Sequence, residues 1–357
     1  MALLQLLRLP AVFTAVADVL AGYLILRFAG AGEGEWRRLP FLALASACLY
    51  LAGMAWNDLF DAEEDRCRRP ERPIPSGQIT PTVAFFIAAV LSIAGLMLAM
   101  SAGRACFFAA AALLGAVLFY DSGGKHLEIV GPLAMAACRG LNLFLGMSCH
   151  ADVWFLLASP LVYLPIALLA AYTAVVTVVA ALETPESHTA ASAPTSEAPS
   201  SLDSQAETEI AIALPAAVHE ASTPPPRRQR AVFGLDPLVL SLGTAGLLLA
   251  PIAGLLLFAV HPLSLFFFGL LFLLLVVRLI DVWRHASYAA VRRLIGAAIF
   301  GMVLLDAGMV AGVVPTAAER WAGWEIELPG PMELAGITMV AAMLLPMWSF
   351  KRRIEVA

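Results

Sequence analysis

Long apolar runs alternate with short polar segments along most of the chain. Each run is close to the roughly 20 residues that an α-helix needs to cross a bilayer. Lipid offers the backbone no hydrogen-bond partners, so such runs must be helices. The pattern predicts an all-α, polytopic membrane helical bundle with about nine to ten transmembrane helices. The predicted spans cover residues 10–29, 41–57, 82–101, 104–120, 130–148, 153–181, 235–258, 262–280, 293–314 and 332–350.

One polar stretch interrupts this pattern. Residues 183–232 are rich in Ala, Ser, Thr, Pro and Glu and contain almost no aromatic residues. Because this composition buries too little apolar surface to offset the entropy of ordering, we expect a disordered cytoplasmic loop. It divides the chain into a first membrane half, residues 1–182, and a second, residues 233–357. We interpret the loop as a tolerated insertion, with a regulatory role as the alternative.

The composition excludes a soluble globular domain. Hydrophobic residues make up 61% of the chain and charged residues 14%, whereas soluble domains carry about 25% charged residues. The net charge is −5, and the basic residues form no stripe of the kind that binds nucleic acid. We therefore expect membrane lipids, and no nucleic acid, among the partners.

Basic residues gather at alternate ends of the predicted spans. Cytoplasmic loops of membrane proteins are enriched in Lys and Arg. We therefore expect a multi-pass protein of the cell (inner) membrane with a cytoplasmic N-terminus. The loops expected in the cytoplasm carry Arg66, Arg68, Arg69, Arg72, Lys125, Arg227, Arg228, Arg230, Arg284, Arg292 and Arg293.

The segment with the clearest chemistry follows the second span. At about 100° per residue, Asp61, Asp65 and Asp58 lie about 40°, 80° and 100° from Asn57 around a helix, so all four share one face. Clustered carboxylates repel one another and attract Mg²⁺, a hard ion that prefers oxygen ligands. The alternative is a solvated acidic helix end that the neighbouring arginines balance. An ionisable cluster at a membrane boundary favours the functional interpretation.

This segment resembles a known family. Asn57–Asp65 matches N-D-x-x-D-x-x-x-D, the first aspartate motif of UbiA-type prenyltransferases, and Arg72–Gly77 is similar to that family's R-P-I-P-S-G segment. The resemblance implies a helical bundle around a central cavity. It also implies Mg²⁺ as cofactor and transfer of a prenyl group from a prenyl diphosphate to an aromatic or other lipophilic acceptor.

Four further residues are candidates for substrate binding. Tyr120 and Lys125 resemble a Tyr and Lys loop that faces diphosphate in the family; for Lys125 the alternative is a membrane anchor. Arg139 and Asn142 lie three residues apart in an apolar span and share a helix face. Because a buried Arg needs a partner, they are either polar groups of the substrate cavity or a staple between helices. Together with Tyr120-Asp121 they resemble the divergent EboC branch of the family.

The expected second acidic motif departs from the family's pattern. The sequence has Glu183-Thr184-Pro185-Glu186 after the sixth span, where the family has D-x-x-x-D or D-x-x-D. Glutamate is still an oxygen ligand, but Pro185 disfavours the helix that would align the pair. The predicted metal ligands are Asp58, Asp61, Asp65, Glu183 and Glu186, of which Glu186 is not assigned a catalytic role.

The sequence thus predicts a Mg²⁺-dependent prenyltransferase. Asn57 and the motif aspartates would organise the metal and the diphosphate, and Arg72, Lys125 and Arg139 would bind diphosphate oxygens. The alternative is a non-catalytic binder or transporter of an isoprenoid-like or other lipophilic metabolite. A third interpretation is a scaffold that recruits a partner through residues 183–232.

Overall fold

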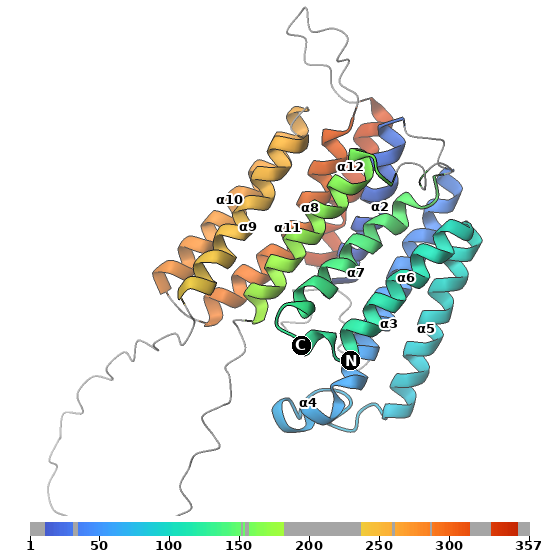
Figure 1. Cartoon of the computed structure of the whole chain (residues 1–357), viewed down its shortest axis with the longest axis vertical. Helices are drawn as coiled ribbons and strands as arrows, with labels where there is room; N and C mark the ends of the chain where they lie inside the picture. Colours follow the sequence, from blue (N-terminus) through green and yellow to red (C-terminus); the bar gives the residue numbers. More distant parts are fainter. Residues whose placement is uncertain are drawn as a thin grey trace, which may run out of the picture. The chain divides into compact units, whose positions relative to one another are not determined.

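The computed structural model describes residues 11–30, 35–150, 153, 157–181, 237–258, 261–285, 288–314 and 330–348. Every regular element among these residues is a helix, which confirms the predicted all-α class (Figure 1). The predicted loop at residues 183–232 lies outside the described residues, as do Glu183 and Glu186.

A long helix occupies each of the ten predicted spans. Among the described residues, eight segments are long and apolar enough to cross a membrane. The other two helices are shorter in this respect. Helix α2 has 17 residues, and the apolar part of α9 is Gly243–Phe258. The long helices are α2 (Val12–Phe28), α3 (Leu39–Phe60), α5 (Pro81–Ala102), α6 (Arg104–Asp121), α7 (Val130–Met147), α8 (Pro160–Ala181), α9 (Pro237–Phe258), α10 (Pro262–His285), α11 (Tyr288–Gly312) and α12 (Pro331–Ala342).

Proline and glycine set several helix ends. Proline suits the first helical position because that position needs no N–H donor. The Thr80 side chain caps α5 by accepting a hydrogen bond from the Val83 N–H at 3.3 Å. Gly103, with φ of 152°, separates α5 from α6. The helices that begin with proline are α5, α8, α9, α10 and α12.

Helix α2 lies inside the bundle and packs against α3, α7, α11 and α12. Its crossing with α7 is unusually close. A Cβ atom on Gly22 would lie 2.0 Å from the Leu143 carbonyl oxygen, and one on Gly146 would lie 2.1 Å from the Val19 carbonyl oxygen. Only glycine at both positions allows the two backbones to approach this far, and this approach brings the polar residues of α2 and α7 together.

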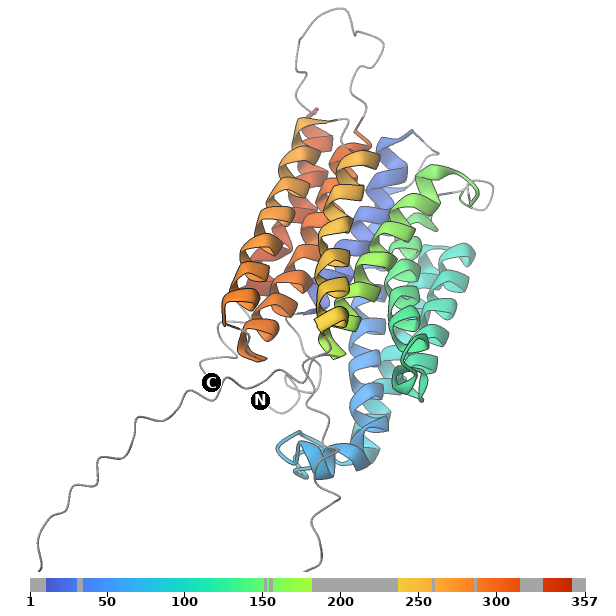
Figure 2. The same ribbon diagram turned by 60° about the vertical axis from the view of Figure 1, so that its left-hand side comes forward.

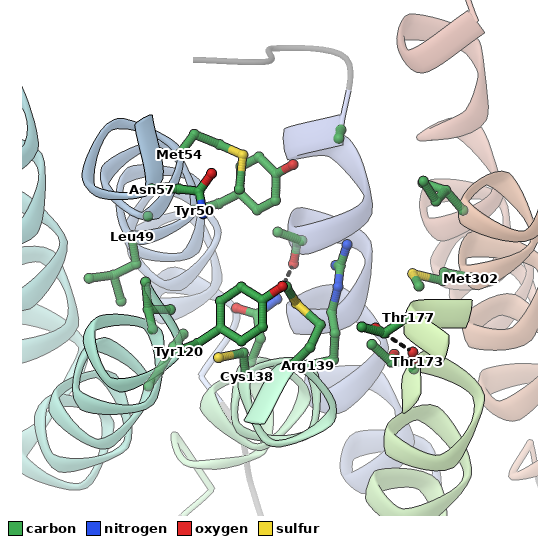
Figure 3. Close-up of a pocket in the computed structure, with 18 of the residues that line it drawn as sticks. Leu49, Tyr50, Met54, Asn57, Tyr120, Cys138, Arg139, Thr173, Thr177 and Met302 are labelled. Carbon is green, nitrogen blue, oxygen red and sulfur yellow. Dashed lines mark hydrogen bonds between the residues drawn. The ribbon is translucent and has the colours of Figure 1, made fainter. Parts of the chain in front are cut away.

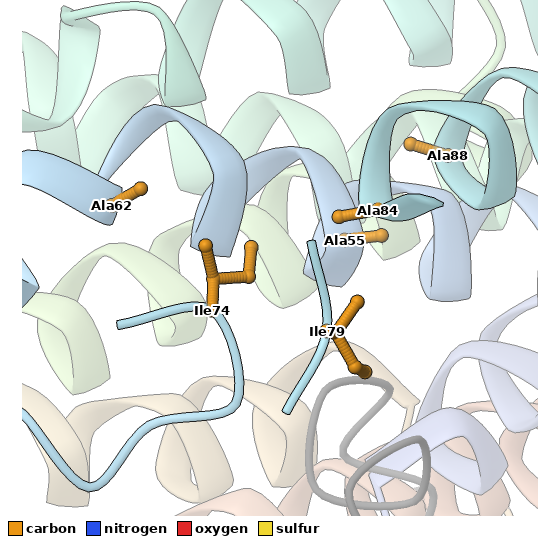
Figure 4. Close-up of a cluster of buried hydrophobic side chains, with 6 residues drawn as sticks. All are labelled: Ala55, Ala62, Ile74, Ile79, Ala84 and Ala88. Atoms are coloured by element: carbon orange, nitrogen blue, oxygen red, sulfur yellow. The ribbon is translucent and has the colours of Figure 1, made fainter. Parts of the chain in front are cut away.

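A short helix, α4 (Ala62–Arg68), follows α3 at the end of the bundle that carries the aspartate motif (Figure 2). The loop after α4 is anchored by Ile74 and Ile79, which are only 6% and 9% exposed. They belong to a buried cluster with alanines of α3, α4 and α5 (Figure 4). This cluster fixes the loop that carries Arg72 against the end of α3. The alanines are Ala55, Ala62, Ala84 and Ala88.

Candidate functional site

A cavity of about 410 Å³ lies among α2, α3, α6, α7, α8 and α11. Figure 3 shows residues of α3 on one side and Thr173, Thr177 and Met302 on the other. Four of the predicted site residues line this cavity, namely Asn57, Tyr120, Arg139 and Asn142. The central cavity that the family resemblance implied is therefore present.

The cavity extends along α3 from Asn57, the first residue of the motif, to Ser46. At 1.5 Å of rise per residue these two positions are about 16 Å apart. Arg139 and Asn142 belong to the Ser46 end, because the Ser46 hydroxyl donates to the Asn142 side-chain oxygen at 2.7 Å. The structure therefore divides the predicted site residues into two groups at different depths.

The first group is an outer ionic cluster formed by Asp58, Asp61, Asp65, Arg72 and Lys125. The Arg72 guanidinium donates to Asp65 at 2.5 Å and lies 3.4 Å from Asp58. The Lys125 ammonium, in the short helix η3 (Gly124–His126), forms an ion pair with Asp61. All three motif carboxylates thus have a cationic partner supplied by the chain itself.

Local helix geometry explains this arrangement. Helix α3 ends at Phe60, and Asp61 is both the C-cap of α3 and the N-cap of α4. The i→i−4 hydrogen bonds continue through the junction, from Asp61 N–H to Asn57 at 3.0 Å and from Asp65 N–H to Asp61 at 2.8 Å. The predicted single face is therefore kept only in part. Asp58 and Asp65 converge on Arg72, whereas Asp61 faces Lys125.

Asn57 joins the outer ionic cluster to the cavity. Its side-chain amide donates to the Asp121 carboxylate at 3.0 Å, which ties α3 to α6. Asp121 also lines the cavity and is 4% exposed. Asp121 is a site residue beyond those predicted, although its position directly after Tyr120 was a usable signal.

The residues around Asp61 offer ligand atoms for a divalent cation. Asp61, Glu64 and His126 each offer a ligand atom, and these atoms lie within 4.8 Å of one another. Asp58 and Asp65 add carboxylate oxygens one turn away along the same chain segment, and hard cations prefer such oxygens. The sequence gives no signal for His126, because no other histidine stands at ligand spacing from it.

The second group is an inner polar network made by Thr14, Asp18, Ser46, Arg139, Asn142 and Asp306. The Arg139 guanidinium donates to Asp18 at 2.8 Å and to the Thr14 hydroxyl at 2.7 Å. The Asn142 amide donates to the same Asp18 oxygen at 3.0 Å and to the Ala15 carbonyl at 2.8 Å.

Arg139 and Asn142 line the cavity and also join α7 to α2, a placement that is compatible with either sequence interpretation. Asp18 is completely buried behind them. A role of Arg139 in binding diphosphate stays a prediction, since its guanidinium already pairs with Asp18 away from the motif.

Comparison with known proteins gives the family. The sequence profile described as the UbiA prenyltransferase family matches residues 16–216, more than half of the chain. Among curated proteins, the digeranylgeranylglyceryl phosphate synthase of Metallosphaera sedula is 31% identical over 156 residues, which are 42% of this chain and 52% of that protein. The synthase of the same name from Ignicoccus hospitalis is 34% identical over 154 residues, 42% of this chain and 48% of that protein. The chain thus matches about half the length of these relatives.

Solved structures share the fold. A UbiA homologue from Aeropyrum pernix K1 in its apo form has a TM-score of 0.59 at 15% identity, over 84% of this chain and 96% of that one. A structure described for the biosynthesis of digeranylgeranylglyceryl phosphate synthase in membranes has a TM-score of 0.54 at 18% identity, over 88% of this chain and 98% of that one. At these identities the likeness establishes the arrangement of helices.

Proposed function

The chain belongs to the UbiA prenyltransferase family, a family of multi-pass membrane proteins, and on that premise we propose that it transfers a prenyl group. The donor is a prenyl diphosphate, and the acceptor is an aromatic or other lipophilic molecule within the membrane. The cofactor is Mg²⁺. The proposal depends mainly on the position of the outer ionic cluster beside Asn57, at one end of a cavity inside an apolar helical bundle.

The residues of the outer ionic cluster suit a diphosphate leaving group. Mg²⁺, when bound to Asp58, Asp61 and Asp65, supplies positive charge that stabilises the departing diphosphate. Arg72 and Lys125 then donate to diphosphate oxygens in place of the carboxylates that they contact in the structure. Glu183 and Glu186 are proposed as further ligands on the strength of the sequence alone.

The cavity suits the rest of the reaction. The bond between the allylic carbon and the diphosphate oxygen breaks, its electron pair leaves with the diphosphate, and the carbon develops positive charge. A new bond from the acceptor to that carbon forms, and the proton that the acceptor loses passes to the released diphosphate. Apolar lining residues such as Leu49, Met54 and Met302 surround the prenyl chain and exclude water, which would otherwise capture the cation.

The curated relatives direct the choice of acceptor. They are named for digeranylgeranylglyceryl phosphate, so we propose a glyceryl phosphate lipid as the first acceptor to supply. Basic residues in the loops near the motif support a cytoplasmic location of the outer ionic cluster, at the face of the cell membrane.

One observation favours a second candidate, a non-catalytic binder of an isoprenoid-like metabolite. Asp58, Asp61 and Asp65 are all engaged by Arg72 and Lys125. A protein that only binds its ligand needs no metal, and these internal ion pairs keep the carboxylates satisfied without one.

Diphosphate release from geranyl diphosphate, measured with the full chain in lipid nanodiscs, separates the two candidates. We expect release that requires Mg²⁺ and falls roughly 10²-fold or more in Asp61→Ala. Glu63→Ala is the matched control, because Glu63 lies two residues after Asp61, on α4, in an exposed pair with Arg66. The Glu183→Ala variant tests the proposed second ligand. Each assay is repeated with membrane lipid extract and with a glyceryl phosphate lipid, so that a missing acceptor does not limit the reaction.

If the wild type binds geranyl diphosphate but releases no diphosphate under any of these conditions, the transferase proposal is rejected and the non-catalytic binder is favoured. Equal activity of Asp61→Ala and Glu63→Ala would reject the assignment of the outer ionic cluster.

A further inference from the structure

Asp306 is a buried carboxyl group that the proposed reaction does not use. It lies on α11 and is completely inaccessible to solvent. Among the described residues, no hydrogen-bond donor reaches either of its oxygens, and none reaches the Oδ1 atom of Asp18. An ionised carboxylate in such a position costs several kcal/mol unless it is paired, so the protonation of these groups needs an explanation.

The two unsatisfied carboxyl groups are neighbours. Asp306 is on α11, which packs directly against α2, the helix that carries Asp18, and both carboxyl groups interact with each other and with the same cation, Arg139. Asp18 uses its Oδ2 atom to accept from Arg139 and from Asn142. Two ionised carboxylates and one guanidinium would leave a net negative charge in the bundle interior. A single proton removes that charge and supplies the missing donor.

We propose that Asp306 is protonated and donates a hydrogen bond to Oδ1 of Asp18, and that this bond positions Arg139 and Asn142 on the cavity wall. With the proton on Asp306, Asp18 stays ionised and accepts on both oxygens. The set of Asp18, Asp306 and Arg139 is then electrically neutral. Asp306 is a positioning residue, because it does not line the cavity, whereas Arg139 and Asn142 do.

The arrangement gives the inner end of the cavity a preference for uncharged polar groups. This assignment of the acceptor site rests on the proposed function. Arg139 is neutralised from behind by Asp18, so it offers hydrogen bonds without a net positive field. Asn142, beside Ser46, adds a neutral polar group to this part of the wall. Such a surface suits an uncharged hydroxyl, carbonyl or phenol group of an acceptor, while the diphosphate belongs to the outer ionic cluster beside Asn57, at the other end of the cavity.

Infrared spectroscopy tests the proton directly and requires no activity. We expect the wild type in nanodiscs at neutral pH to show the C=O stretching band of a protonated carboxylic acid, and Asp306→Asn to lack it. Asp281→Asn is the matched control, because Asp281 is a carboxylate that pairs with Arg293 at 2.8 Å on the same half of the chain. Loss of the band in the control, or no band in the wild type, would overturn the proposal.

Two substitutions at Asp306 separate positioning from simple damage. Asparagine keeps a side-chain donor for Asp18 and is expected to keep the unfolding midpoint and the turnover within about twofold of wild type. Leucine keeps the volume but removes the donor, and we expect turnover to fall about ten- to a hundredfold. Binding of geranyl diphosphate should stay within about twofold in both variants, since that ligand binds at the outer end.

A merely structural role would lower binding and turnover together in Asp306→Leu. Equal losses in the asparagine and leucine variants would show that Asp306 acts as a charge and would overturn the proposal. If the wild type has no transferase activity, the infrared band and the unfolding midpoints still decide the protonation of Asp306. The failure of the proposed function is therefore distinguishable from the failure of this inference.

Discussion

The two polar regions of the cavity hold their charges on different kinds of structure. In the outer ionic cluster the cations lie on a loop and a short helix, and the side chains of Arg72 and Lys125 keep 18% and 11% exposure. In the inner polar network every charged residue lies on a long helix. Asp18 is on α2, Arg139 on α7 and Asp306 on α11, and both aspartates are fully buried.

This difference assigns ligand binding and structural support to different regions of the cavity. A cation on a loop can exchange its carboxylate for a phosphate oxygen by a small movement of the loop. A cation on a helix that is locked against its neighbour cannot change partners without separating the helices and leaving a buried charge unpaired. We therefore assign ligand exchange to the outer ionic cluster and the geometry of the cavity wall to the inner polar network.

The largest effect is expected when the inner ion pair is broken. Arg139→Leu leaves the Asp18 carboxylate buried with no cation, and removal of one partner of a buried pair costs about 3–5 kcal/mol. The free energy of unfolding, measured by titration with a denaturing detergent in mixed micelles, should fall by this amount. Its matched counterpart in the outer ionic cluster is Lys125→Met, which leaves Asp61 able to reach water and should cost about 1 kcal/mol or less.

The double variant Arg139→Leu with Asp18→Leu sharpens this result. Replacing both partners with apolar residues removes the unpaired charge, so part of the lost stability should return. If Arg139→Leu cost no more than Lys125→Met, burial would not distinguish the two regions, and the assignment above would be wrong.

A smaller loss is expected when the helices that carry the inner polar network are forced apart. In Gly22→Ala the new methyl group would meet the Leu143 carbonyl, so α2 and α7 must move, and overpacking of this kind costs about 1–3 kcal/mol. Gly115→Ala is the control, because among the described residues no atom beyond the nearby backbone of its own helix lies within 4 Å of the added Cβ. There alanine should be neutral or stabilise α6 by up to about 1 kcal/mol.

Unfolding titrations of the two glycine variants, side by side with the wild type, check this expectation. Because Asp18 lies one helical turn before Gly22, the Gly22→Ala variant should also lower turnover, whereas Gly115→Ala should not. Equal stability of the two variants would mean that α2 and α7 adjust without strain.

The fold and the motif could be predicted from the sequence because both depend on residues that are close together along the chain. Apolar runs of bilayer length define the helices, and Asn57–Asp65 places its carboxylates within a few turns of one another. The ion pair between Asp18 and Arg139 joins residues 121 positions apart, and no local pattern encodes such a contact. No local pattern encodes the proximity of His126 to Asp61 either, because it depends on the packing of α6 against α3.

The break at Asp61 was missed for a different reason. Sequence periodicity continues across it, and so do the i→i−4 hydrogen bonds of Asp61 and Asp65. The periodicity treats residues 57–65 as one regular helix, whereas the loop anchored by Ile74 pulls Arg72 toward only two of the three carboxylates. Tertiary anchoring of a loop thus decided which carboxylate faces which cation.

The smallest effect is expected at an ion pair that belongs to neither region. Arg66 and Glu63 pair at 2.8 Å on α4, with 58% and 83% of their side chains exposed. Exposed pairs of this kind contribute about 0–1 kcal/mol, because water and salt screen them. Arg66→Ala should therefore leave both the free energy of unfolding and geranyl diphosphate turnover nearly unchanged. A large loss of turnover with unchanged stability would show that the ligand-exchange region extends beyond the outer ionic cluster along α4, and the division between ligand binding and structural support would then have to include this helix.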